Sequence, residues 1–287
     1  MTAPAAALVL TWPVVLVVLF GALLHASWNV LVKSSTDKAL DTALIHLLGS
    51  LIALPLLLVV GLPGTASWPY ILASVVIHIG YYIALTGAYK HGDMGLTYPL
   101  MRGVAPMLVA VSAVMTVGES LAPMAWVGVL GICVGVLALG LSRHALDNRR
   151  ATLFALANAV VIAVYTVIDA LGARASGNAV QYVVALFVLD GWPFALLVLA
   201  RRGRAAWPYA RARWPVAAGG ALASLGSYGI ALWAMTRAPV ATVAALRETS
   251  VLFAALLGTW LLKEQFTPRR ALGTCVIVAG VMALRLA

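Results

Sequence analysis

The sequence predicts an all-α polytopic membrane protein with ten transmembrane helices, arranged as two five-helix repeats of inverted topology. Three observations support this fold class: the chain has few charges, its apolar residues form long runs, and the end of its first half recurs in its second half. Of its 287 residues, 63% are hydrophobic and 10% are charged, whereas roughly 25% of residues are charged in typical soluble domains. So few charges exclude a soluble enzyme, a nucleic-acid-binding protein and a disordered chain.

Each apolar run has about 20 residues, the length that an α-helix needs to cross a bilayer. The runs are continuous rather than alternating, which favours helices over a β-barrel. Fewer than about ninety residues remain outside the runs, so an additional soluble domain does not fit. The expected spans are residues 13–32, 43–61, 70–88, 97–117, 123–142, 151–171, 180–199, 215–235, 240–262 and 270–286.

The end of the first half recurs in the second half after a shift of 145 residues. An intramembrane arginine, a glutamate that closes the same span and a proline that opens the next one all recur, which indicates a duplication. Each half holds five spans, and because five is odd the second half enters the membrane from the opposite side. We therefore divide the chain into repeats 1–145 and 146–287 and expect a substrate site at their interface. The aligned pairs are Thr97 and Thr242, Arg102 and Arg247, Ala110 and Ala255, Glu119 and Glu264, Pro123 and Pro268, Gly128 and Gly273, and Gly135 and Gly280.

The basic residues are distributed unevenly between the two sides of the membrane. With the N-terminus on side one, the loops on the opposite side carry 14 of the 19 Lys and Arg, side one carries 3, and 2 lie within spans. Basic loops stay in the cytoplasm. The net charge of +10 therefore predicts a topology with both termini extracytoplasmic, rather than a nucleic-acid partner.

The chain resembles the drug/metabolite transporter superfamily, specifically its EamA-type ten-helix members. The resemblance rests on the ten spans, the duplicated halves and the glutamates that close spans four and nine, Glu119 and Glu264. It covers nearly the whole chain and implies a secondary active transporter, an exporter or exchanger of a small metabolite that does not hydrolyse ATP. Residues 25–29, 98–103 and 247–250 resemble a bacterial subgroup associated with phosphonate utilisation, which implies a bacterial inner membrane. Many members are drawn with cytoplasmic termini, whereas the charges here indicate the opposite.

Arg102 and Arg247 are the strongest candidates for substrate binding. Each arginine stays charged, and a charge at the centre of a bilayer costs roughly 2.5–3.5 kcal/mol or more. A pair that faces inward can hold a carboxylate, phosphonate or phosphate, which predicts a small polar substrate that is anionic or zwitterionic. The alternative is that each arginine pairs with an acid only to lock the two halves together. Glu248 need not be the partner of Arg247, because adjacent helical residues point about 100° apart.

The intramembrane acids divide into candidates for proton transfer and candidates for structural roles. Asp169 and Glu248 are the acids best suited to carry a proton, and the alternative for Asp169 is a salt bridge or a helix-end contact. Asp190 precedes Gly191-Trp192-Pro193 and is expected to mark a bend. Glu119 and Glu264 lie at span ends, where we expect them to cap helices or pair with loop charges.

Five further residues are expected to line the substrate site. His25, Trp28 and Asn29 lie three and four residues apart, which places them on one helix face. Tyr98 and Tyr165 are expected to contribute amphipathic walls. These five residues and the two arginines form the predicted binding set.

Nothing in the sequence predicts a metal site, a cofactor or a catalytic residue. Motifs of the GxSxG and HExxH types, metal-spaced aspartates and a phosphate-binding loop do not occur. Cys133 and Cys275 lie in apolar runs and are expected to pack as small apolar side chains. We expect His25, His46 and His78 to make hydrogen-bonded helix contacts.

The expected partners are a small-molecule substrate and the lipid bilayer, with a homodimer left open. An intramembrane lipid-modifying enzyme, a lipid scramblase or a structural partner is the alternative to a transporter. The inverted duplication favours the transporter, because a static scaffold does not need two exchangeable half-sites.

Overall fold

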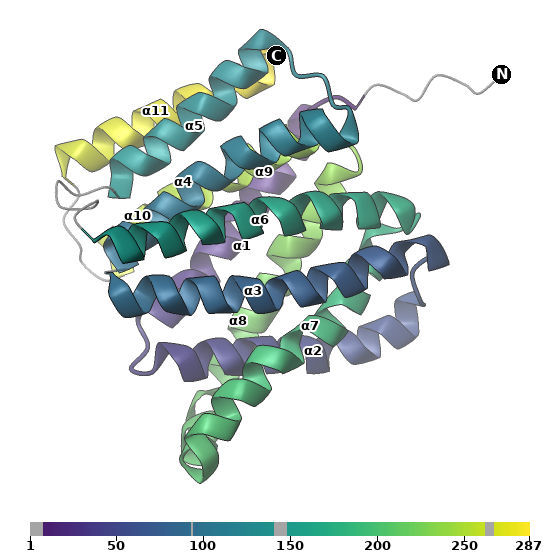
Figure 1. Ribbon diagram of the computed structural model, residues 1–287, viewed down its shortest axis with the longest axis vertical. Helices are drawn as coiled ribbons and strands as arrows, with labels where there is room; N and C mark the ends of the chain where they lie inside the picture. The colour runs from purple at the N-terminus through teal and green to yellow at the C-terminus, as the bar shows by residue number, and fades with distance from the viewer. Residues whose placement is uncertain (1–7, 93, 141–147, 262–266) are drawn as a thin grey trace.

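The computed structural model describes residues 8–92, 94–140, 148–261 and 267–287, and these residues are helical, with no β-strand among them (Figure 1). Three short 3-10 or π segments adjoin the helices: η1 (Thr65–Ser67), η2 (Ala113–Val117) and η3 (Gly203–Ala205). The α-helices are α1 (Trp12–Lys33), α2 (Lys38–Val60), α3 (Trp68–His91), α4 (Met94–Ser112), α5 (Pro123–Gly140), α6 (Arg149–Ala175), α7 (Ala179–Arg202), α8 (Ala206–Met235), α9 (Val240–Arg247), α10 (Ser250–Leu261) and α11 (Pro268–Leu286).

Within the described residues, eight stretches are long and apolar enough to cross a membrane, judged by length and composition. One stretch, Ala179–Met235, contains both α7 and α8. Helix α11 is not among the eight, and it carries three arginines. The chain is therefore a polytopic helical membrane protein.

Local sequence signals explain where several helices begin and end. The Asp37 carboxylate accepts a hydrogen bond from the Leu40 amide (3.1 Å) and caps α2. Asn178 caps α7 in the same way, at 3.0 Å from the Val180 amide. Such caps satisfy amide groups that lack a partner in the first helical turn. Gly61 ends α2 with a φ of 81°, a left-handed conformation that glycine adopts without strain.

The structure differs from the expected spans in two places. Residues 201–213 lie between the expected spans 180–199 and 215–235 and were expected to form a polar loop. They are largely helical, because α7 continues to Arg202 and α8 begins at Ala206. The expected span 240–262 is broken between α9 and α10, where Glu248 and Thr249 form a turn. The Thr249 hydroxyl donates to the Leu246 carbonyl oxygen at 2.7 Å and so satisfies one of the carbonyl groups at the end of α9.

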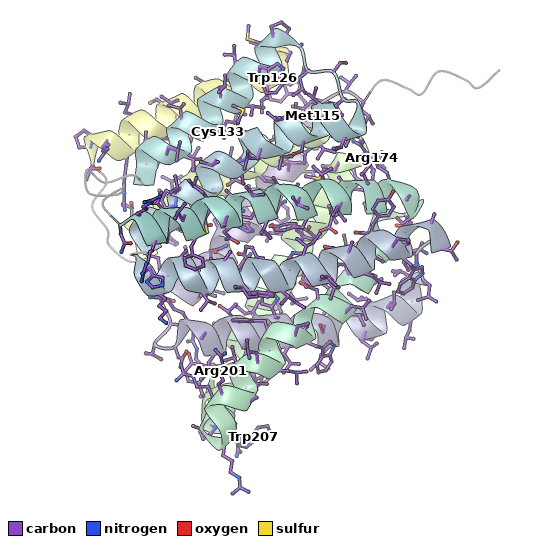
Figure 2. All side chains as sticks on the ribbon, viewed as in Figure 1. Met115, Trp126, Cys133, Arg174, Arg201 and Trp207 are labelled. Atoms are coloured by element: carbon purple, nitrogen blue, oxygen red, sulfur yellow. The ribbon has the colours of Figure 1, made fainter. Side chains whose placement is uncertain are left out.

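The main helix contacts join elements that are far apart in the sequence. Helix α5 packs along α11, α2 along α7, α3 along α6, and α1 along α8. In Figure 1, α5 and α11 lie side by side along the upper edge of the molecule. The end of α7 and the start of α8 form an elbow that projects at the lower end, where Figure 2 labels Arg201 and Trp207.

Helices α5 and α11 approach closely because glycines face each other. A Cβ atom at Gly128 would lie 2.8 Å from the carbonyl oxygen of Gly280, and one at Gly135 would lie 2.9 Å from that of Gly273. Small residues at membrane helix contacts allow the backbones to approach in this way. Cys133 on α5 is buried, as expected, but Cys275 on α11 is exposed. The expectation for Cys275 was wrong because α11 packs mainly against α5, so other faces of α11 point away from the bundle.

Candidate functional site

A cavity lies between the two halves of the chain. Its wall contains residues from α1 to α4 and from α6 to α9. The volume of the cavity is about 120 Å³, which is below the usual range of small-molecule sites. All seven residues of the predicted binding set lie in the wall: His25, Trp28, Asn29, Tyr98, Arg102, Tyr165 and Arg247.

The expected shared helix face on α1 is confirmed. The rings of His25 and Trp28 are in edge contact, with centroids 5.3 Å apart. The Asn29 side-chain amide donates to the His25 carbonyl oxygen at 2.7 Å. All three side chains reach the cavity wall, so α1 presents one polar and aromatic face to it.

Arg102 on α4 is paired with an acid from the other half of the chain. Its Nε atom lies 2.8 Å from Oε2 of Glu248, and both residues are buried. The two atoms are not aligned as a hydrogen bond, and Nη2 of Arg102 also has no hydrogen-bond partner, so the contact is ionic. For Arg102, the structure thus contains the acid pairing that the sequence left open as an alternative.

Arg247 is held differently from Arg102. Its guanidinium lies 5.3 Å from the centre of the Tyr228 ring, a cation–π contact, and it makes no salt bridge within the described chain. The repeat explains this difference, because the first-half position equivalent to Glu248 is Gly103. Arg102, Arg247 and Glu248 together therefore carry a net charge of +1, without the Asp190 carboxylate of the cavity wall.

The break between α9 and α10 lies at this charged cluster. Arg247 is the last residue of α9, and Glu248 is the first residue of the turn. Interrupted membrane helices are typical of transporter binding sites, where the broken backbone lines a cavity. The second half thus supplies Arg247 and Glu248 from the end of one helix, and the first half supplies Arg102.

Asp169 on α6 lies outside the residues that line the cavity. It is fully buried and accepts hydrogen bonds from the hydroxyl groups of Tyr182 (2.8 Å) and Tyr228. The sequence left open a salt bridge or a helix-end contact for Asp169. Its hydrogen-bond partners in the structure are instead two tyrosine hydroxyl groups. Asp169 fixes the Tyr228 ring that contacts Arg247.

Comparison with known proteins finds a family similarity. Residues 149–286 match the model of the EamA-like transporter family. The second half of the chain is therefore similar to EamA-like transporters. The match confirms the resemblance to the drug/metabolite transporter superfamily, whose members are membrane transporters. The assignment to a phosphonate-associated subgroup stays a prediction.

The whole chain also resembles solved structures. A crystal structure titled only as that of a protein has a TM-score of 0.76 and 20% sequence identity, and the alignment covers 96% of this chain and 98% of the other. At this identity the similarity shows the fold alone. No curated protein matches the sequence at a significant level.

Glu119 has the structural role that its position at the end of a span predicts. Its carboxylate pairs with Arg174 at 2.9 Å and accepts hydrogen bonds from the amides of Val240 (2.9 Å) and Ala241 (3.4 Å). Glu119 therefore caps α9, which confirms the expectation of a cap or a charge pair. Its expected equivalent, Glu264, lies outside the described residues.

Sequence reasoning missed Asp190 as part of the cavity wall. Helix α7 continues through Asp190 and Pro193, and the expected bend at this position stays a prediction. The Asp190 carboxylate lies 3.6 Å from Nδ1 of His78, and both residues line the cavity. The signal that could have found Asp190 is its charge, because an ionisable residue inside a membrane is by default a candidate for function.

One face of α3 was missed as well. His78, Tyr81, Tyr82 and Leu85 line the cavity, and their spacing of three, four and seven residues is that of one helix face. The expected helix contacts of two histidines are confirmed: His46 contacts the Tyr82 hydroxyl at 3.3 Å, and His78 contacts the carbonyl oxygen one turn earlier at 3.0 Å. Further wall residues that the sequence did not single out are Met101, Asn158, Ile162, Leu186, Phe187, Ser224, Ser227 and Tyr228.

Proposed function

We propose that this protein is a secondary active transporter that exports or exchanges a small anionic or zwitterionic metabolite. The observation that carries the proposal is the unequal arginine pair at the cavity: Arg102 is neutralised by Glu248, and Arg247 has no acidic contact in the described chain. A cation without an acidic contact is costly inside a membrane protein. A carboxylate, phosphonate or phosphate group of the substrate would neutralise it with charge-assisted hydrogen bonds.

Alternating access would follow from ten spans in two inverted repeats, residues 1–145 and 146–287. Helix contacts support this arrangement, because exchange of the two halves converts the contact of α1 with α8 into that of α6 with α3. The glycine contacts behave in the same way. The shift of 145 residues converts the pair Gly128 and Gly280 into Gly273 and Gly135, which also face each other. The proposed site lies between these repeats.

We further infer a bacterial inner membrane location, with the basic loops in the cytoplasm and both termini outside. The cavity residues of α1 and α4 lie nearer the helix ends that face the basic loops, whereas those of α8 lie nearer the opposite end. On the side away from the basic loops, Glu119 joins Arg174 to the start of α9. This contact supports closure of that side, and therefore access to the substrate site from the cytoplasm, in this conformation. The oligomeric state of the purified protein tests whether a homodimer forms.

The test compares two arginines that both contact aromatic rings. Arg247→Gln removes the cation at the cavity, whereas Arg237→Gln removes a guanidinium that lies 4.7 Å from the Trp233 ring on an exposed segment. Purified variants are screened for thermal stabilisation by small carboxylates, phosphonates and amino acids, and compounds that bind are followed by counterflow into proteoliposomes.

Arg247→Gln is expected to weaken binding of acidic compounds about tenfold to a hundredfold, from the loss of a charged contact, and to abolish counterflow. Arg237→Gln is expected to behave as the parent protein. Equal binding and flux in both variants, or stabilisation only by cations without an acidic group, would contradict the proposal. Conversion of the compound to a new product would indicate an enzyme instead.

A further inference from the structure

Several buried polar atoms in the described cavity wall have no hydrogen-bond partner, and they divide by chemistry. The donors are Nε1 of Trp28 on α1 and the guanidinium nitrogen Nη2 of Arg102 on α4. The acceptors are Oδ1 of Asn158 and Oδ1 of Asp190, on α6 and α7. Buried polar groups in proteins nearly always have a partner. These atoms point to a ligand that offers both hydrogen-bond acceptors and hydrogen-bond donors.

His78 does not satisfy the Asp190 carboxylate. Its Nδ1 atom lies 3.0 Å from the carbonyl oxygen of Ser74 and 3.6 Å from Oδ1 of Asp190. The Ser74 hydroxyl lies 3.3 Å from the same Nδ1 atom, so both close contacts of Nδ1 are with Ser74, within α3. The Asp190 side chain is 15% exposed, which leaves its acceptor atom buried at the cavity wall and in need of a donor.

Aromatic rings lie around His78, the residue that Asp190 contacts. The His78 ring lies 4.5 Å from the Tyr165 ring and 6.2 Å from the Tyr81 ring, measured between centroids. Asp190, His78, Tyr81 and Tyr165 all line the cavity. Within the described chain, Asp190 has His78 within 4 Å and forms no salt bridge with either arginine. A carboxylate among ring faces is suited to an ammonium group.

We propose that Asp190, flanked by His78, Tyr81 and Tyr165, forms a cation-binding subsite that receives the protonated amine of a zwitterionic substrate. The arginine end of the cavity then binds the acidic group of the same molecule. This inference rests on the proposed function, because it assumes that the cavity between the halves is the substrate site. It narrows the substrate class from anions in general to amino acids, aminophosphonates and related molecules with an amine and an acid.

The test uses pairs of probes that differ only in the amine. Binding of 2-aminoethylphosphonate is compared with that of ethylphosphonate, and 4-aminobutyrate with butyrate, by calorimetry on the purified full-length protein. The parent protein is expected to bind at least one amine-containing member about tenfold more tightly than its partner. This comparison needs no variant, so it holds even if a substitution at Asp190 prevents folding.

The variant Asp190→Asn is expected to lower the affinity for the amine-containing members about tenfold to a hundredfold and to leave the amine-free members within about twofold. The matched control is Asp37→Asn. Asp37 caps the start of α2, pairs with Arg202 and does not line the cavity. Asp37→Asn is expected to bind both members as the parent does.

The outcomes separate this inference from the proposed function. If no amine-containing member binds more tightly than its partner, or if Asp190→Asn leaves the preference intact, the subsite assignment is wrong. If Asp190→Asn removes only a pH dependence of butyrate binding, Asp190 is a proton site and the assignment is also wrong. In each case Arg247→Gln still tests the arginine end, because it is expected to weaken both members of a pair.

Discussion

Two buried charges at the contact between Arg102 and Glu248 hold α4 against the turn that follows α9. Removal of one charge leaves the other buried without its partner, which typically costs about 3–5 kcal/mol, whereas replacement of both by apolar residues is often neutral. We predict that Arg102→Met and Glu248→Met each lower stability by about this amount and that the double variant recovers most of it. Unfolding in detergent measures the three variants, and additive losses would show that the ion pair is not a stabilising unit.

The two arginines show what the sequence reveals about individual residues. The duplication alone singled out Arg102 and Arg247, because polar residues rarely recur at equivalent positions in two apolar spans. The partner of Arg102 was not predictable, since Glu248 lies in the other half and only the folded chain brings it within 2.8 Å. Asp190 was interpreted from its neighbours Gly191, Trp192 and Pro193, and the direction of its side chain depends on how α7 packs.

At the scale of elements, Glu119 provides the cap that α9 cannot obtain from its own sequence. The residue before α9 is Pro239, which makes no side-chain cap, and Glu119 supplies a carboxylate to two amides of the first turn. We predict that Glu119→Ala lowers stability by about 2–4 kcal/mol, because it removes the cap and leaves Arg174 without an acid. Asp37→Ala, which removes one amide contact at α2 and a solvent-exposed pair with Arg202, is expected to cost about 1 kcal/mol. Equal losses in thermal unfolding would contradict the prediction.

The contact between α5 and α11 depends on the absence of side chains at its glycines. A Cβ atom at Gly280 would lie 2.9 Å from the carbonyl oxygen of Gly128 and 2.9 Å from the amide nitrogen of Ile132. Backbone atoms cannot move aside as a flexible side chain can. We predict that Gly280→Ala lowers stability by about 1–3 kcal/mol, measured by unfolding in detergent.

Gly219 on α8 is the matched control for Gly280, because a Cβ atom there would meet nothing within 4 Å. Gly219→Ala is expected to be neutral or to stabilise the helix by up to about 1 kcal/mol. If Gly280→Ala behaves in the same way, α5 and α11 do not need their close approach.

The helices themselves follow from apolar run length more closely than from any other signal. The run 123–142 corresponds to α5 and the run 270–286 to α11, with ends that differ by at most two residues. Run length could not predict the break after α9, because the apolar run continues through it and the turn requires only that the backbone find other hydrogen-bond partners. It also could not predict that helix continues beyond the apolar run into Ala206–Trp214, since helices can extend past the bilayer into polar sequence.

For the whole molecule, the cavity and the charge distribution make a linked prediction about access. Ser224 on α8 lines the cavity, and in this conformation the path to the cavity is expected from the side of the basic loops. We predict that Ser224→Cys, in a chain with Cys133→Ala and Cys275→Ala, reacts with a membrane-impermeant thiol reagent in inverted vesicles at least about tenfold faster than in right-side-out vesicles. Equal rates in both preparations would show that this conformation does not prevail in the membrane. Arg201→Cys in the same background reports the orientation of the vesicles, because it lies on the elbow between α7 and α8.

Orientation decides whether that side is the cytoplasm. Fourteen of the 19 basic residues belong to loops that the inverted arrangement assigns to one side, and the translocation machinery retains basic loops in the cytoplasm. A fusion of alkaline phosphatase to Ala287 is therefore expected to be active and a fusion of green fluorescent protein at the same place to be dark. Fusions after Arg204, in the most basic segment, should give the reverse pattern. A fluorescent fusion at Ala287 together with an inactive phosphatase would place the C-terminus in the cytoplasm. The side of the basic loops would then face outside. The cavity would open to the outside in this conformation, and the same binding site would collect its substrate from the opposite compartment.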